Sequence, residues 1–291
     1  MRLPAVVLGC LTLLILYGCT QLFFQPSRLL VISPEQLGLD YADIYFHSAD
    51  GTKLHGWFFP AKTQPVKGTF IQFHGNAQNI STHFRSLVWV IEYGYHLFTF
   101  DYRGFGRSEG QVSLAGTLDD VLAAIAQARR LASSEAGKKL ILYGQSLGGA
   151  LVLYTAGTMN DRRDIAVVIA DSAFGSYQSL AKEKLASQWL SFLFQPLTYV
   201  LVSDRYAPQR VLAEISPVPL LVIHGDGDEI VPIHHGQSIY DRAMAPKWFW
   251  KLEGVGHIQA MSPRYSQYRK DLLNFLDEMA NVSKLPIERS P

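Results

Sequence analysis

A serine between two glycines is the residue best suited to chemistry in this chain. The apolar, strand-forming stretch Leu140–Tyr143 continues directly into Gly144-Gln145-Ser146-Leu147-Gly148, and helical spacing of apolar residues follows. A Gly-x-Ser-x-Gly turn between a strand and a helix is so tight that larger side chains would clash, and it exposes the serine hydroxyl at the head of the helix. Ser146 is therefore predicted to be a nucleophile.

A serine hydroxyl needs a general base to act at neutral pH, and the base needs an acid to orient it. Nine histidines are available. His257 lies in a glycine-containing loop directly after the last predicted strand, and we predict that it is the base. His234 and His235 open a predicted helix and are expected to lie on the surface. His74 is expected to be a buried, hydrogen-bonded residue that shapes a loop.

Three carboxylates follow the apolar strand that precedes Gly225. The acid of a strand–Ser–helix hydrolase falls between the serine and the histidine in the chain, and Asp228 is our prediction for it. Asp226 precedes a glycine and suits a turn, whereas Glu229 is expected to face solvent. Asp171, at the end of the preceding strand, remains the alternative acid.

Backbone N–H groups must also be available to stabilise the oxyanion that forms when a serine attacks a carbonyl. The predicted strand 68–73 ends in His74-Gly75-Asn76, a loop in the position where such donors are found. The N–H groups of Asn76 and Leu147 are therefore the predicted oxyanion hole.

These residues need a scaffold, and the hydrophobic pattern predicts an α/β fold with a mostly parallel sheet. Runs of strand length recur at 43–48, 53–59, 68–73, 95–101, 139–144, 165–171, 218–224 and 247–252. Stretches with helical spacing lie at 79–93, 117–134, 147–158, 234–244 and 262–280. The turn Ser48–Thr52 is hairpin-like, so the first two strands should be antiparallel.

One interval, 173–216, has no strand pattern and is rich in aromatic and apolar residues. We expect it to be a lid insertion at the carboxyl edge of the sheet, within a single domain over 41–291. Its apolar part, Ser187–Val202, is interrupted by Pro196 and is too short to span a bilayer, which takes about 20 residues. Two short amphipathic helices are expected, which either complete the core or face lipid.

The N-terminus has the pattern of a secretory signal, with a short positive end followed by an apolar run, so residues 1–18 are expected to be a signal peptide. Leu16-Tyr17-Gly18-Cys19 resembles the lipobox of bacterial lipoproteins, which are cut before a cysteine that then carries the lipid. This resemblance implies a lipidated Cys19, a tether over 19–40 and a place in the bacterial cell envelope. The alternatives are an uncleaved membrane anchor running to about Phe24, or plain secretion.

Composition narrows the remaining possibilities. The chain is 48% hydrophobic and 18% charged with a net charge of +1, which is typical of a globular protein and argues against nucleic acid as a partner. Cys10 and Cys19 are the only cysteines, so no disulfide framework is expected further along. No His/Asp/Glu group has metal-ligand spacing, and Gly104, Gly106 and Gly110 miss the dinucleotide-binding spacing by one residue. Neither a metal nor a cofactor is predicted.

These motifs together resemble the α/β-hydrolase superfamily. They occur in its order: His74-Gly75-Asn76, Asp101-Tyr102-Arg103-Gly104-Phe105-Gly106-Arg107-Ser108, Gly144 to Gly149, His224 to Pro232, and His257. The resemblance implies an α/β-hydrolase fold, with an eight-stranded, mostly parallel sheet flanked by helices and a short helical lid. It also implies Ser146 as nucleophile, Asp228 as acid and His257 as base.

The pattern is most similar to a branch that contains membrane-associated depalmitoylases, monoacylglycerol-lipase-like enzymes and bacterial hydrolases. The activity this implies is hydrolysis of acyl or thio esters through an acyl-enzyme, with a small acyl ester or a lipid as substrate. A peptidase or amidase on the same fold is the alternative enzyme, since a triad does not define the leaving group. A lipid-anchored, non-catalytic binding protein is the alternative outside enzymes.

Overall fold

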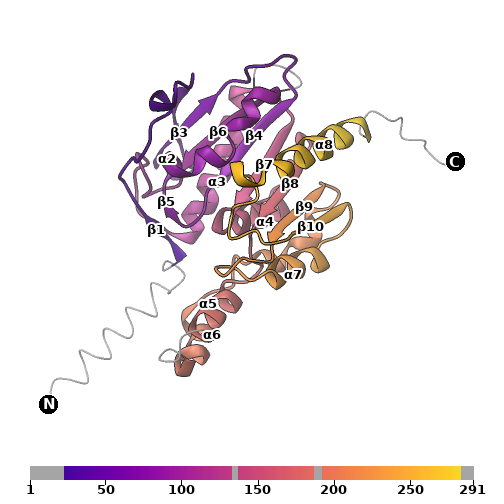
Figure 1. Ribbon diagram of the computed structural model, residues 1–291. Coiled ribbons are helices and arrows are strands. Elements are labelled where there is room, and N and C mark those ends of the chain that lie inside the picture. The colour runs from indigo at the N-terminus through magenta and orange to yellow at the C-terminus, as the bar shows by residue number, and fades with distance from the viewer. Residues whose placement is uncertain (1–22, 133–136, 187–191, 283–291) are drawn as a thin grey trace.

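A single twisted sheet of eight strands forms the centre of the molecule, with helices on both faces (Figure 1). The computed structural model describes residues 23–132, 137–186 and 192–282. The predicted signal peptide and Cys19 lie outside these residues. The strand order is β10-β9-β8-β7-β4-β6-β3-β2, and the predicted α/β-hydrolase architecture is confirmed.

The bounds of the strands lie close to the predicted ones. In chain order the sheet comprises β2 (Ala42–His47), β3 (Lys53–Phe59), β4 (Gly68–Phe73), β6 (Tyr95–Asp101), β7 (Leu140–Gln145), β8 (Ile165–Asp171), β9 (Leu220–Gly225) and β10 (Lys247–Leu252). β2 pairs antiparallel with β3, and β3 antiparallel with β6, whereas all the other pairs are parallel. The carboxyl ends of β4, β7, β8, β9 and β10 therefore meet at one edge of the sheet.

The helices agree with prediction except in one stretch. α4 (Leu147–Thr158), α7 (His234–Arg242) and α8 (Ser266–Val282) lie where expected, and α3 (Leu114–Leu131) begins early because the Ser113 hydroxyl caps it. The single helix predicted over 79–93 was wrong. Those residues form α2 (Ile80–His83) and the 3₁₀ turns η3 (Phe84–Ser86) and η4 (Val88–Tyr93). The β-branched and aromatic run in η4 explains this, since such side chains lose rotamer freedom in an α-helix.

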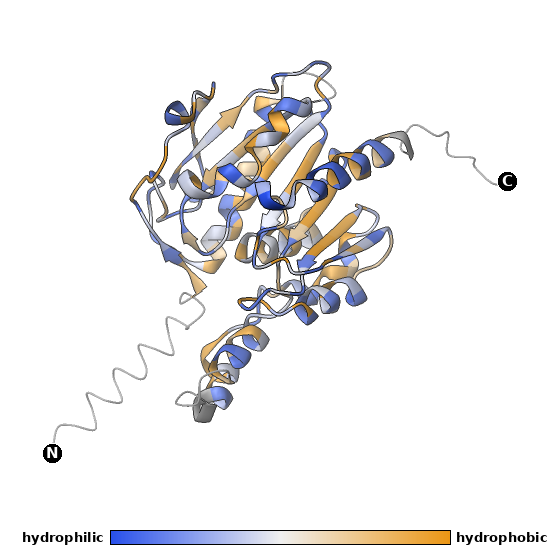
Figure 2. Cartoon of the chain, in the orientation of Figure 1, coloured by the Kyte–Doolittle hydropathy of each residue, from blue (hydrophilic) through white to orange (hydrophobic). Residues whose placement is uncertain are grey.

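Two apolar layers cover the sheet. Alternate side chains of β7 point to opposite faces: Leu142 joins the layer that includes α3 and α4, and Ile141 joins the layer that includes α2, η4 and α8. Hydrophobic residues accordingly fill the central strands, and polar residues lie on the outer sides of the helices (Figure 2). Because both faces are covered, the strands are apolar along nearly their whole length.

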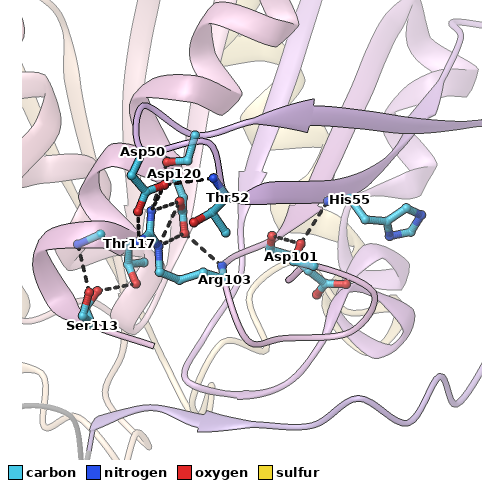
Figure 3. A network of polar contacts seen from close by, with 11 residues as sticks. Asp50, Thr52, His55, Asp101, Arg103, Ser113, Thr117 and Asp120 are labelled. Atoms are coloured by element: carbon cyan, nitrogen blue, oxygen red, sulfur yellow. Dashed lines mark hydrogen bonds and ion pairs between the residues drawn. The ribbon is translucent and has the colours of Figure 1, made fainter. Parts of the chain in front are cut away.

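A buried arginine holds the loop after β6 in place (Figure 3). The Arg103 guanidinium donates to the fully buried Asp120 of α3 at 2.8 Å and to Asp50, in the β2–β3 turn, at 2.7 Å. The backbone N–H of Arg103 also donates to Asp120, at 2.9 Å. One side chain thus joins three segments that are distant in sequence.

The interval 173–216 contains helices and no strand within the residues that the structure describes. Its elements are α5 (Tyr177–Ala186), η5 (Phe192–Leu197), α6 (Thr198–Leu201), η6 (Pro208–Arg210) and η7 (Leu212–Ile215). α5 and α6 project from the body of the domain (Figure 1). In the described part of the chain, no helix combines the length and the hydropathy needed to cross a bilayer.

Candidate active site

The serine turn connects β7 to α4 through a strained residue. Ser146 has φ 54° and ψ −116°, a conformation that side chains rarely adopt. A Cβ atom on Gly148 would lie 2.1 Å from the carbonyl oxygen of Phe73, and one on Gly144 would lie 2.6 Å from the carbonyl oxygen of Gly148. Only glycine fits at either position, so the motif allows α4 to start directly against the ends of β7 and β4.

The structure brings His257 and Asp228 into contact at the same edge of the sheet. His257 Nδ1 lies 2.7 Å from Asp228 Oδ2, and the other carboxylate oxygen accepts the N–H groups of Ile230 and Val231 at 2.9 and 2.8 Å. Since a carboxylate can only accept, Nδ1 is the donor in this hydrogen bond, and Nε2 is the ring nitrogen that does not bond Asp228. This is the orientation that a general base requires.

Asp228 is kept ionised although it is buried. Burial raises the pKa of its carboxyl, but hydrogen bonds from His224 and His257, the charge of His257 and the N–H of Val231 outweigh that and hold the pKa below its ordinary value. An ionised Asp228 stabilises the positive charge that His257 would acquire on taking a proton.

The alternative carboxylates have other partners. Asp171 accepts a hydrogen bond from the Tyr143 hydroxyl at 2.8 Å, and burial raises the pKa of its carboxyl. Asp226 accepts the N–H of Gly254 at 2.7 Å, which fits its expected place in a turn, and Glu229 is exposed. Of these side chains, Asp228 is the one hydrogen-bonded to His257.

A short series of hydrogen bonds joins the serine turn to the histidine loop. Ser146 N–H donates to the carbonyl of Asp171 at 2.8 Å, and the hydroxyl of the next residue, Ser172, accepts the N–H of Ile258 at 3.0 Å. Two consecutive residues, Asp171 and Ser172, thus bind the backbone of Ser146 and of Ile258, the residue that follows His257. Ser172 was not predicted from the sequence, although it directly follows a strand that ends at the site.

The predicted oxyanion donors also lie at this edge. Leu147 is the first residue of α4, where helix geometry leaves the N–H without an intrahelical acceptor. Gly75 lies across from the turn, since a Cβ built on it would be 3.8 Å from that of Ser146. Asn76 follows Gly75, so both predicted donors come from segments that border Ser146.

Comparison with known proteins shows the family to which the chain belongs. Residues 64–212 match the family described as serine aminopeptidase, S33. The chain is also 38% identical over 237 residues to the protein YfhR of Escherichia coli K12, covering 80% of this chain and 79% of that one. The chain belongs to this family of α/β hydrolases. It is 28% identical over 264 residues to the α/β-hydrolase domain-containing protein WAV2 of Arabidopsis thaliana, covering 87% and 84% of the two chains.

Among solved structures, this α/β hydrolase resembles an esterase. Esterase Pf2001 of Pyrococcus furiosus superimposes with a TM-score of 0.70 at 20% identity, covering 88% of this chain and 98% of that one. At that identity the likeness establishes the shared fold alone.

Backbone strain gathers around the site of this hydrolase. Within the described residues, the non-glycine positions with positive φ are Gln78, Ser146, Ser172 and Ile258. Positive φ is a true outlier for a β-branched residue such as Ile258, which follows the candidate base. Gln78 and Ile258 also line a cavity of about 250 Å³, together with Thr82, His83, Ser86 and Gln145. Strain of this kind is typical of functional sites.

Within the residues that the structure describes, one group of side chains could hold a metal ion: Glu183, His234 and His235. Glu183 of α5 contacts His234 at 2.9 Å and His235 at 3.2 Å, with one carboxylate oxygen on each ring. His235 is buried, contrary to the expectation of two surface histidines, whereas His234 is exposed as expected. Each ligand atom of the cluster already has a partner, so the contacts are explained without an ion.

Two buried side chains, His74 and Asp101, support the candidate oxyanion loop, residues 74–78. Burial, with the charge of His83, lowers the pKa of His74 to about 3, and its Nδ1 hydrogen-bonds the carbonyl of Gly75 at 2.8 Å. Burial raises the pKa of Asp101 to about 7, although its carboxylate accepts the N–H of Ile80 at 2.9 Å. His74 is thus a neutral loop-shaping residue, as expected, and Asp101 supports the same loop from below.

The Asp101 carboxyl makes stability depend on pH. Its pKa is higher in the folded protein than in the unfolded chain, so the folded state binds more protons between those values and loses stability as pH rises through them. We expect Asp101→Asn, which cannot ionise, to remove this loss. Between pH 5 and 8 the unfolding free energy of the wild type should fall by ~2 kcal/mol relative to the variant, measured by urea denaturation.

Asp271→Asn is the control for that measurement, since Asp271 is an exposed carboxylate on α8. Its stability curve should run parallel to that of the wild type. Parallel curves for Asp101→Asn as well would show that Asp101 does not change its protonation in this range.

Proposed function

We propose that this protein is a serine hydrolase that cleaves carboxylic esters or thioesters through an acyl-enzyme. The observation that carries the proposal is the 2.7 Å contact between His257 Nδ1 and Asp228, at the sheet edge where Ser146 occupies a strained strand–turn–helix position. A buried, ionised acid and an oriented histidine are the groups that convert a serine hydroxyl into a nucleophile.

The steps follow from the roles of these side chains. Ser146 Oγ attacks the substrate carbonyl while His257 Nε2 takes its proton, and Asp228 stabilises the imidazolium. The N–H groups of Asn76 and Leu147 bind the oxyanion, and each such donor contributes about 10²–10³ to the rate. His257 returns the proton to the leaving group, and water then releases the acyl group by the same sequence of transfers.

Amide or peptide hydrolysis is the second candidate. It is favoured by the description of the matching family as serine aminopeptidase. The same residues would serve, because the difference lies in protonation of the leaving nitrogen. Parallel assays on an ester and an amide with the same acyl group test this candidate. Because esters are intrinsically more reactive than amides, turnover of the amide is the deciding result: its absence supports the ester proposal, and its presence supports the amidase.

A lipid substrate at a membrane is the third part of the proposal, on the branch that includes depalmitoylases and monoacylglycerol-lipase-like enzymes. The N-terminal pattern supports a lipid on Cys19 and a place in the bacterial cell envelope. Three apolar side chains near the end of the projecting insertion are exposed: Leu197, Tyr199 and Val200, at 46, 61 and 70%. Exposed apolar side chains on a short helix suit contact with lipid.

Ser146→Ala should abolish ester hydrolysis while leaving the fold intact, because it removes only the nucleophilic oxygen. A rate 10³–10⁴ above that in water could remain from the oxyanion hole and binding. The measurements are turnover of p-nitrophenyl esters and labelling by a fluorophosphonate probe, with circular dichroism as the folding control. Absence of labelling in the wild type would favour the non-catalytic binding protein, and full activity in the variant would require another nucleophile.

Asp228→Asn should lower kcat by about 10⁴, since an amide at this position favours the wrong tautomer of the histidine. Asp171→Asn is the matched control, because Asp171 is also a buried carboxylate at a strand end but bonds Tyr143 instead of His257. We expect it to retain activity within about tenfold. The reverse ranking of the two variants would make Asp171 the acid.

Removal of residues 1–19 should separate chemistry from membrane placement. The truncated protein should hydrolyse short soluble esters at the wild-type rate but act poorly on long-chain esters in phospholipid vesicles. Equal retention on both substrates would show that the anchor plays no part in catalysis. Equal loss on both would mean that the truncation harms the domain itself.

A further inference from the structure

The segment Phe23–Val31 is the first described part of the chain, and it does not hang free of the domain. Its strand β1 (Gln25–Pro26) pairs in parallel with β5 (Ala77–Gln78), which follows Asn76 directly. The N–H of Gln25 donates to the carbonyl of Asn76 at 2.7 Å, and the N–H of Ser27 to the carbonyl of Gln78 at 3.3 Å. The segment therefore lies along the loop that carries a predicted oxyanion donor.

Further hydrogen bonds continue this contact towards α2. The buried amide of Asn79 donates to the carbonyls of Ser27 and Leu29 at 2.9 and 2.7 Å. The N–H of Val31 donates to the Ser81 hydroxyl at 2.9 Å, and the carbonyl of Ser27 also accepts the N–H of Gly106 at 2.9 Å. Backbone groups of 25–31 are thus hydrogen-bonded both to the segment 76–81, which follows β4, and to the loop after β6.

Two aromatic side chains fix the start of the segment. Phe24 is buried against Phe105, with ring centroids 6.5 Å apart. Phe23 packs on Phe174 at 6.0 Å and on Tyr177, the first residue of α5, at 5.3 Å. The segment therefore touches the oxyanion loop, the loop after β6 and the base of the projecting insertion.

The candidate oxyanion loop, residues 74–78, has contacts on both sides: inside the domain His83 Nε2 lies 3.1 Å from the carbonyl oxygen of Ala77, and on the outside Gln25 bonds Asn76. Gln78 has φ 63°, an unfavourable conformation that persists only where surrounding contacts impose it. Inside the domain, the Tyr102 hydroxyl donates to the carbonyl of His74 at 3.2 Å, and the Asp101 carboxylate accepts the N–H of Ile80. Between these contacts, the hydrogen bond to Gln25 is what fixes the carbonyl of Asn76.

We propose that residues 23–31 are a positioning element of the active site: by pairing with residues 76–78, they set the oxyanion loop in its working geometry. The proposal rests on the proposed function for its kinetic consequence. The stretch that leads from the membrane anchor to the domain is then also part of the catalytic scaffold. A displacement of about 1 Å in a catalytic group can cost about 100-fold in rate, so the hydrogen bond to Asn76 matters even though it never touches substrate.

The kinetic signature of this role is specific. An oxyanion donor acts on charge that develops in the transition state, so misplacing it lowers kcat and leaves KM nearly unchanged. A segment that merely formed part of the substrate-binding surface would change KM instead.

Gln25→Pro tests the proposal in the full-length protein, because proline removes the N–H that bonds Asn76 and keeps the chain length. Gln25→Ala is the matched control, since it keeps that N–H and loses only an exposed side chain. On a short soluble ester we expect kcat to fall 10- to 100-fold for Gln25→Pro with KM within threefold. Gln25→Ala should stay within twofold of the wild type.

Amide hydrogen exchange provides a readout that does not depend on catalysis. Gln25→Pro should speed exchange in peptides covering 74–81 and leave those covering α4 and β10 unchanged. Asn79→Ser is a milder second variant, since serine can still cap α2 but lacks the amide NH2 group that donates to both Ser27 and Leu29. It should show the same pattern with a smaller fall in kcat.

Each other outcome overturns the proposal in a distinguishable way. Unchanged exchange at 74–81 in both variants would show that the segment does not fix the loop. Faster exchange with unchanged kcat, or a rise in KM alone, would show that the loop so fixed does not serve the transition state. A wild-type protein that neither turns over esters nor reacts with fluorophosphonate would refute the proposed function, while the exchange data would still decide whether 23–31 hold the loop.

Discussion

The close approach of α4 to the ends of β4 and β7 is the constraint on which the rest of the site depends. It exists because Gly144 and Gly148 have no Cβ, and it forces Ser146 into a conformation that costs of order 1–3 kcal/mol. Packing offsets this cost, since α4 is apolar around most of its circumference and buried between α3, the sheet and the turns η6 and η7. With the helix fixed there, its first N–H group necessarily borders the loop after β4.

Electrostatics at the carboxyl edge of the sheet separates three buried carboxylates. Asp228 receives two backbone N–H groups and a histidine, so it stays ionised. Asp101 and Asp171 have fewer compensating donors, and burial raises the pKa of both. The pKa values of these chemically equal groups therefore move in opposite directions. Asp228 differs from the other two chiefly through its contacts with His224 and His257.

The two loops that border the candidate active site, the one after β4 and the one that carries His257, are stabilised differently. The histidine loop is held from within the domain, through Ser172 and Asp228. The oxyanion loop instead combines an internal support, formed by Asp101 and Tyr102, with an external one formed by residues 23–31. That external support also packs on Tyr177 at the base of α5, so residues 23–31, the insertion and the loop after β4 share one set of contacts.

The strands and the serine turn could be predicted from the sequence, because each is set by residues that lie close together in the chain. Strands such as β3 and β6 follow from runs of apolar residues, and the serine turn follows from glycine spacing, so their positions were predicted to the residue or nearly so. Tertiary structure decided what depends on distant partners: the contact of His257 with Asp228 rather than Asp171, the pairing of β1 with β5, and the meeting of Glu183 with His234 and His235. The physical reason is the distance along the chain over which each effect acts. Hydrophobic periodicity and turn preferences depend on a few neighbouring residues, whereas these contacts depend on how the helices and the sheet pack together.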